Sequence, residues 1–142
     1  MADISSICVY CGSRFGHPQG YRETAVQLGQ EIARRGLRLV YGGGHVGLMG
    51  ALADAVLEAG GAVTGVIPRH LQDWEVGHEG LTELHVVDTM HGRKQLMFEL
   101  SDGFVALPGG IGTLDETLEI MTWRQLRLHD KPLVILDQGG FW

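Results

Sequence analysis

Short apolar runs alternate with longer amphipathic stretches along most of the chain. Six runs have the length and composition of buried strands: Ile7–Tyr10, Leu37–Tyr41, Ala62–Ile67, Leu84–Val87, Phe104–Leu107 and Leu133–Leu136. Three stretches carry apolar residues at helical spacing: Tyr21, Ala25, Leu28 and Ile32; Leu48, Leu52 and Val56; Leu114, Leu118 and Met121. A fourth helix is traced by Met90, Lys94, Met97 and Leu100. Strands joined by right-handed helical crossovers form a parallel sheet covered on both faces. The pattern therefore predicts an α/β fold with a doubly wound parallel sheet.

A glycine-rich segment links the fifth apolar run to the last helical stretch. It reads Pro108-Gly109-Gly110-Ile111-Gly112-Thr113-Leu114-Asp115-Glu116. Its three glycines allow the backbone to turn sharply and to approach a ligand closely, and the amides of a helix N-terminus attract an anion. The segment predicts a phosphate site. Thr113-x-x-Glu116 is also a capping box, in which Thr113 would cap the helix and Glu116 would bond back to the cap amide.

A second glycine-rich segment follows the second apolar run. Gly42, Gly44 and Gly47 satisfy G-x-G-x-x-G, but no acidic residue ends the next strand to hold the ribose of a dinucleotide. A mononucleotide site is therefore favoured over an NAD site. Ligands of such sheets bind beyond the carboxyl ends of the strands, where both glycine segments fall. The interruption at Asp73–Gly80 predicts a surface loop at the same edge.

Arg93 and Lys94 form the only adjacent Arg-Lys pair and stand near the start of a predicted helix. They fit either a solvated basic face or an anion site, and the planar guanidinium of Arg93 suits phosphate and carboxylate groups. Cleavage of an N-glycosidic bond builds positive charge on the ribose, which a carboxylate such as Glu116 can stabilise. Glu75 is either a second contact to the ribose or base, or a solvent-facing glutamate.

Composition narrows the choice of function. The chain has 142 residues, a net charge of −6, 22 glycines, and no apolar run long enough to span a membrane. We expect one cytoplasmic domain over residues 1–142 that binds neither nucleic acid nor a membrane. Cys8 and Cys11 should point to opposite faces of a strand as reduced thiols. The seven histidines show neither H-x-H nor H-E-x-x-H spacing, so we predict no metal site.

Taken together, these motifs resemble the LONELY GUY (LOG) family of cytokinin riboside 5′-monophosphate phosphoribohydrolases, and the resemblance runs from Cys11 to Phe141. It rests on Cys11-Gly12-Ser13, Gly42–Gly50, Met90-His91-Gly92-Arg93-Lys94 and Pro108–Glu116. Arg14 departs from the small residue usual after Cys-Gly-Ser. The resemblance implies a Rossmann-like homodimer without a cofactor. It also implies hydrolysis of AMP, or of an N6-substituted AMP, to free base and ribose 5-phosphate.

The resemblance assigns residues to the site. It implies that Arg93 and Glu116 are catalytic. Substrate contacts are expected at Glu75, Met90, Lys94, Gly43, Gly44, Gly109, Gly110, Ile111, Gly112, Thr113, Leu114, Asp115 and Thr122.

One competing function and one question about the end of the chain remain open at the level of sequence, and one family label does not fit the residues. Related Rossmann-like proteins bind nucleotides or a molybdenum cofactor without cleaving them, so a non-catalytic carrier is the competing function. Similar sequences have been labelled lysine decarboxylases, but a pyridoxal enzyme needs a Schiff-base lysine, and the chain has only Lys94 and Lys131. After the last predicted strand, either a partner subunit covers the outer face or C-terminal helices of the family are missing.

Overall fold

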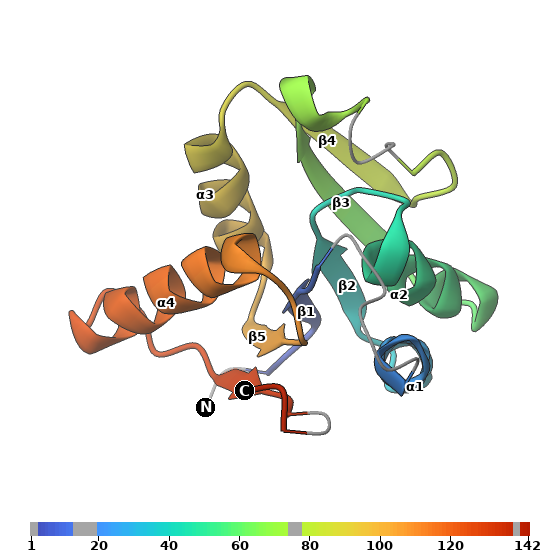
Figure 1. The fold of residues 1–142 in the computed structure, drawn as a ribbon, viewed down its shortest axis with the longest axis horizontal. Coiled ribbons are helices and arrows are strands. Elements are labelled where there is room, and N and C mark those ends of the chain that lie inside the picture. The colour runs from blue at the N-terminus through green and yellow to red at the C-terminus, as the bar shows by residue number, and fades with distance from the viewer. Residues whose placement is uncertain (1–2, 13–19, 74–77, 138–139) are drawn as a thin grey trace.

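The computed structural model describes residues 3–12, 20–73, 78–137 and 140–142. Its centre is a six-stranded sheet in the order β4-β3-β2-β1-β5-β6, and every neighbouring pair is parallel (Figure 1). The strands are β1 Ser6–Tyr10, β2 Arg38–Tyr41, β3 Val63–Pro68, β4 Glu83–Val87, β5 Gly103–Ala106 and β6 Leu133–Ile135. All six predicted strands are confirmed, each within one residue of its predicted bounds.

Four α-helices connect the strands at the predicted places. They are α1 Gly20–Arg34, α2 Gly47–Glu58, α3 Met90–Leu100 and α4 Ile111–Gln125. One short 3-10 helix, η1 Arg69–Leu71, has no counterpart in the sequence prediction. None of the helices within the described ranges is both long and apolar enough to cross a membrane.

Helices cover both faces of the sheet, which confirms the doubly wound prediction. Helices α1 and α2 lie on one side of the sheet and α3 and α4 on the other (Figure 1). Apolar residues form a separate core on each side, one including Leu39 and Leu52 and the other including Met97 and Phe104. Cys8 belongs to the second core and Cys11 packs against the first, so the two thiols do point to opposite faces.

The order of the strands places a switch point beside β1. Strands β2, β3 and β4 follow one another outward from β1, whereas α3 carries the chain back so that β5 pairs with the other side of β1. The segments after β1 and β5 therefore diverge to opposite sides at the carboxyl edge. This divergence leaves a crevice where open α/β sheets bind their ligands.

Candidate active site

A cavity of about 240 Å³ lies at the carboxyl edge of the sheet. Residues from the segments after β1, β2 and β5 line it together with residues of α3 and α4. Seven predicted site residues are among them: Met90, Arg93, Gly110, Gly112, Thr113, Asp115 and Glu116. The fold thus brings the two glycine-rich segments, the Arg-Lys helix and Glu116 to one place.

Arg93 is held firmly at the inner wall of this cavity. Thr89 caps α3, and its side chain accepts a hydrogen bond from the amide of Gly92, which fixes the start of the helix. Arg93 follows in the first turn and is only 6% exposed. Its Nε donates to the carbonyl of Val66 at 3.0 Å and its Nη2 to the carbonyl of Gly42 at 2.5 Å. The side chain therefore joins α3 to β3 and to the residue that follows β2.

Two glycines are required by the close packing around this cavity. A Cβ on Gly42 would overlap the guanidinium of Arg93, and a Cβ on Gly109 would overlap the Thr113 side chain and approach the amide of Gly12. Gly109 and Gly42 thus allow each glycine-rich segment to contact a neighbouring part of the site. The sequence analysis predicted a close approach of this backbone to a ligand, and here the backbone also approaches other parts of the protein.

Helix α4 begins three residues earlier than a capping box at Thr113 would require. Gly110 is the N-cap and no side chain caps it, so Thr113 lies inside the first turn, where its carbonyl accepts a hydrogen bond from the Thr117 hydroxyl. The capping-box prediction is therefore wrong, because the glycine turn is tight enough for the helix to start at Ile111. Glu116 stands in the second turn, half-buried, and faces the cavity.

Lys94 contacts acidic side chains of α4. Its Nζ lies 2.7 Å from Oδ2 of Asp115 and 3.4 Å from Oε2 of Glu119. The hydrogen bond from Lys94 to Asp115 raises the pKa of the ammonium group, against the opposing effect of burial. Lys94 does not line the cavity, but its partner Asp115 does. Lys94 thus reaches the site through Asp115.

The other predicted site residues lie around the cavity rather than on its wall. Ile111, Leu114 and Thr122 are exposed on α4, and the Thr122 hydroxyl donates to the carbonyl of Leu118. Gly43, Gly44 and Gly109 belong to the two glycine-rich segments but do not line the cavity. Glu75 lies outside the described residues, as do Ser13 and Arg14.

Sequence reasoning missed several residues of the cavity wall. Tyr10 lines it at the end of β1, and burial raises the pKa of its hydroxyl far above the ordinary value. Met49, Leu71 and Met97 add apolar surface. Tyr10 and Met97 fall in a predicted strand and a predicted helix, and apolar periodicity does not distinguish a core face from a cavity wall. The cavity therefore has a polar side at the glycine segments and an apolar side suited to a planar base.

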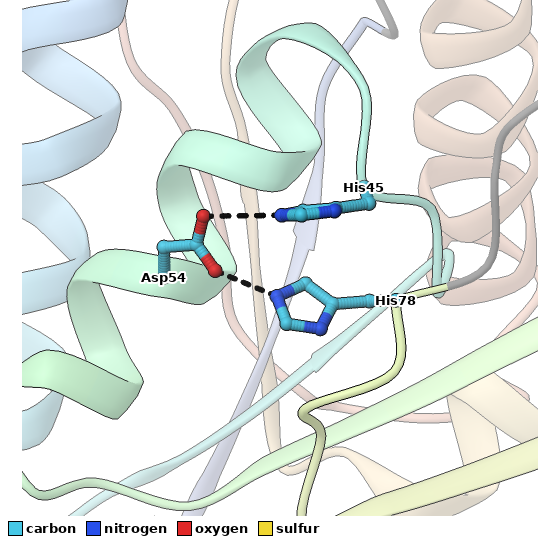
Figure 2. A group of neighbouring side chains, drawn as sticks. All are labelled: His45, Asp54 and His78. Carbon is cyan, nitrogen blue, oxygen red and sulfur yellow. Dashed lines mark hydrogen bonds and ion pairs between the residues drawn. The ribbon is translucent and has the colours of Figure 1, made fainter.

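Among the described residues, one group of side chains could hold a metal ion: His45, Asp54 and His78 (Figure 2). Nε2 of His78 lies 2.6 Å from Oδ1 of Asp54, and Nε2 of His45 lies 3.3 Å from Oδ2. The amide of Gly80 donates to Nδ1 of His78 at 2.9 Å, so the proton of the neutral ring is on Nε2. That proton occupies the lone pair that a metal would need. The arrangement is thus a hydrogen-bonded triad, which linear spacing of histidines could not reveal.

One family model and several curated proteins match most of the chain in sequence. A family model described as "Possible lysine decarboxylase" matches residues 49–142. A cytokinin riboside 5′-monophosphate phosphoribohydrolase of Rhodococcoides fascians is 52% identical over 138 residues, which cover 96% of this chain and 70% of that protein. The enzyme of the same name, LOG, from Oryza sativa subsp. japonica is 50% identical over 136 residues, 96% of this chain and 56% of that protein. The chain therefore spans less than two thirds of the rice relative.

Solved structures share the fold. The Moco carrier protein from Chlamydomonas reinhardtii superposes with a TM-score of 0.78 at 24% identity, over 98% of this chain and 80% of that chain. The molybdenum cofactor binding protein from Rippkaea orientalis gives a TM-score of 0.76 at 25% identity, over 97% of this chain and 79% of that chain. The two phosphoribohydrolases, at 52% and 50% identity, define the family of this chain more narrowly than the solved structures at 24% and 25% identity do. The chain belongs to the LONELY GUY family of cytokinin riboside 5′-monophosphate phosphoribohydrolases.

Proposed function

We propose that this protein hydrolyses the N-glycosidic bond of AMP, or of an AMP with a substituted N6, and releases the free base and ribose 5-phosphate. The observation that carries the proposal is the convergence of Arg93 and Glu116, from two different helices, on one cavity at the switch point of the sheet. The names of the relatives at about 50% identity support the same reaction.

The polar side of the cavity suits the phosphate and ribose. Gly110 and Gly112 stand at the N-terminus of α4, where amides and the helix dipole favour an anion. Arg93 adds a positive charge on the facing wall, and its bonds to Val66 and Gly42 fix its orientation before substrate arrives. The base would lie toward Met49 and Met97, which offer apolar surface for the ring.

The carboxylate of Glu116 then acts on the sugar. As the bond between C1′ and N9 breaks, its electron pair leaves with the base and C1′ becomes cation-like. The negative charge of Glu116 stabilises that cation and steers a water molecule, whose oxygen bonds to C1′. The departing base takes up one proton and the attacking water releases one, so the reaction consumes one water and leaves the charge balanced.

The experiment compares release of free base by the unaltered chain and by the Glu116→Gln and Arg93→Ala variants. AMP and an N6-substituted AMP are the substrates, and chromatography detects the base. We expect base release to be lost in both variants while circular dichroism shows a folded protein. The control is Glu23→Gln, at an exposed position on α1, which should retain activity. Full activity of either site variant would overturn the proposed mechanism.

A non-catalytic carrier is the competing function, since the chain shares its fold with the Moco carrier protein. A carrier would bind AMP-like ligands, return them unchanged and tolerate Glu116→Gln. The decarboxylase description has less support, because neither lysine lines the cavity. Lys94 pairs with Asp115, and Lys131 donates to the carbonyl of Phe98 and lies over its ring.

We further propose that the protein acts in the cytoplasm as a homodimer. Helix α4 supports the dimer, because it buries Thr117 and Ile120 on one side and exposes an apolar stripe on another. The stripe consists of Ile111, Leu114, Leu118 and Met121. Such a stripe is typical of a helix that packs against a second subunit.

A further inference from the structure

Three successive carbonyls in the loop after β2 each accept a hydrogen bond from a different donor. The carbonyl of Gly42 accepts from Nη2 of Arg93, that of Gly43 from the amide of His78 at 3.0 Å, and that of Gly44 from the hydroxyl of Tyr41 at 2.7 Å. Gly43 also adopts a positive φ of 79°, a conformation that only glycine holds without strain. The shape of this loop is therefore set by contacts with the rest of the chain.

The donor to Gly43 is itself anchored through its side chain. His78 is 7% exposed, and its Nε2 lies 2.6 Å from Oδ1 of Asp54 on α2 (Figure 2). Because Nδ1 accepts a hydrogen bond from the amide of Gly80, the ring proton is on Nε2, and Nε2 donates a hydrogen bond to the carboxylate of Asp54. Both ring nitrogens are thus satisfied. The amide that supports Gly43 stands at a residue whose ring has a single favourable orientation.

Asp54 also contacts the residue that follows the loop. Its second oxygen lies 3.3 Å from Nε2 of His45, the residue that directly follows Gly44 (Figure 2). One carboxylate on α2 therefore contacts the loop from its end, through His45, and from its middle, through His78 and Gly43. Gly42, at the start of the same loop, lines the cavity and accepts from Arg93.

We propose that Asp54 and His78 are positioning residues that hold the loop Gly42–Gly44 in the shape that binds substrate and orients Arg93. The proposal rests on the proposed function for its kinetic test, but the loop's rigidity can be measured without turnover. Neither residue lines the cavity, so His78 acts through the carbonyl of Gly43, and Asp54 acts through His78 and His45.

The Asp54→Asn variant separates hydrogen bonding from charge and from metal binding. The amide oxygen of an asparagine can accept from Nε2 of His78, and its amino group can donate to Nε2 of His45. Asp54→Asn therefore keeps both hydrogen bonds and removes only the negative charge. Asp54→Ala removes both contacts. Glu58→Ala is the matched control, because Glu58 is an exposed acid one turn further along α2.

The first readout is amide hydrogen exchange of the peptide that contains the loop. We expect Asp54→Ala to speed exchange there by about tenfold, and Asp54→Asn and Glu58→Ala to leave it within about twofold. The second readout is steady-state release of base from AMP. Because the loop both binds substrate and orients Arg93, Asp54→Ala should lower kcat/KM by about tenfold, and Asp54→Asn should restore it.

The outcomes separate this proposal from the proposed function. If the unaltered chain releases no base, the proposed function fails, but loop exchange still decides the role of Asp54. Unchanged exchange in Asp54→Ala would overturn the proposal that Asp54 and His78 hold the loop. Equal acceleration of loop exchange in Asp54→Ala and Asp54→Asn would overturn it as well. Zinc titration into the unaltered chain provides the remaining arm. If chelator treatment reproduces the Asp54→Ala exchange pattern and zinc reverses it, the triad is a metal site, and the proposal that hydrogen bonds of Asp54 and His78 hold the loop is wrong.

Discussion

Arg93 on α3 is hydrogen bonded to the backbone of Gly42, a residue 51 positions away in the loop after β2, with 2.5 Å between Nη2 and the carbonyl oxygen. The guanidinium also donates to the carbonyl of Val66 within β3. A buried arginine that bonds to two carbonyls contributes to the structure as well as to the charge of the cavity. Gly42 has no Cβ, and this absence leaves room for the contact.

Gly42→Ala should therefore disturb Arg93 specifically. The new methyl group would overlap the guanidinium, so we expect a loss of about 1–3 kcal/mol in the free energy of unfolding together with most of the activity. In an Arg93→Ala background the same substitution meets no guanidinium, and its further effect should stay within about 0.5 kcal/mol. Urea denaturation of the two single variants and the double variant measures this. Simple additivity of the two substitutions would contradict the steric explanation.

Most of the fold could be predicted because its signals are local. The strands and helices follow from the alternation of apolar runs with helical spacing. The strand order was not predicted, because strand pairing joins residues far apart in the chain. The convergence of Arg93 and Glu116 was also readable, since each stands just after a strand that ends at the same edge. The predicted cap at Thr113 was wrong because a capping motif within a helix has the same spacing as one at its start.

The contacts that the sequence did not reveal join residues far apart in the chain. The triad brings together His45, Asp54 and His78, and no periodicity relates a loop, a helix and a second loop. The spacing of Asp115 and Glu119 places them one turn apart on α4. It does not show that both contact Lys94, which belongs to a different helix. Tyr10 lies in a predicted buried strand, and burial against a cavity wall has the same sequence pattern as burial in the core.

Asp102 should make stability depend on pH in the acid range. Its Oδ2 accepts hydrogen bonds from the backbone and hydroxyl of Ser5, each at 2.9 Å, and from the amide of Ser6 at 3.2 Å. The hydrogen bond from the Ser5 backbone, followed by the other Ser5 and Ser6 donors, lowers the pKa of this carboxyl despite partial burial. The folded state therefore favours the carboxylate over the neutral acid.

The sign of the effect follows from that lowered pKa. The stabilisation is complete above the unfolded value of about 3.9 and is lost as pH falls through the lower folded value. Because the carboxyl is only partly buried and is screened by solvent, we expect Asp102→Asn to destabilise the protein by about 0.5–1 kcal/mol at pH 7, and the difference from the unaltered chain to shrink below about pH 4. Urea denaturation at several pH values measures it. Asp130→Asn, at an exposed position, is the control, and a difference that grows in acid would contradict the assignment.

Lys94 and Asp115 should be energetically coupled across the gap between α3 and α4. The lysine side chain is only 13% exposed, and its removal would leave Asp115 and Glu119 one turn apart without their cation. A double-mutant cycle of Lys94→Met and Asp115→Asn should give a coupling of about 0.5–1 kcal/mol. Because the pKa of Lys94 is raised, the coupling should persist through neutral pH and fade only above the ordinary lysine value of about 10.4. A coupling near zero at pH 7 would show that the pair contributes no stability.

Leu118 tests the proposed dimer at the apolar stripe of α4. Its side chain is 56% exposed, and a charge there would be buried without a partner if the stripe packs against a second copy. Leu118→Lys should therefore shift the mass in solution from twice the chain mass to the single-chain value of 15.5 kDa, as measured by light scattering after gel filtration. The control, Glu23→Lys at an exposed position on α1, introduces a lysine away from the stripe, with a larger change in net charge, and should remain dimeric. A Leu118→Lys protein that still elutes as a dimer would place the subunit contact elsewhere on the surface.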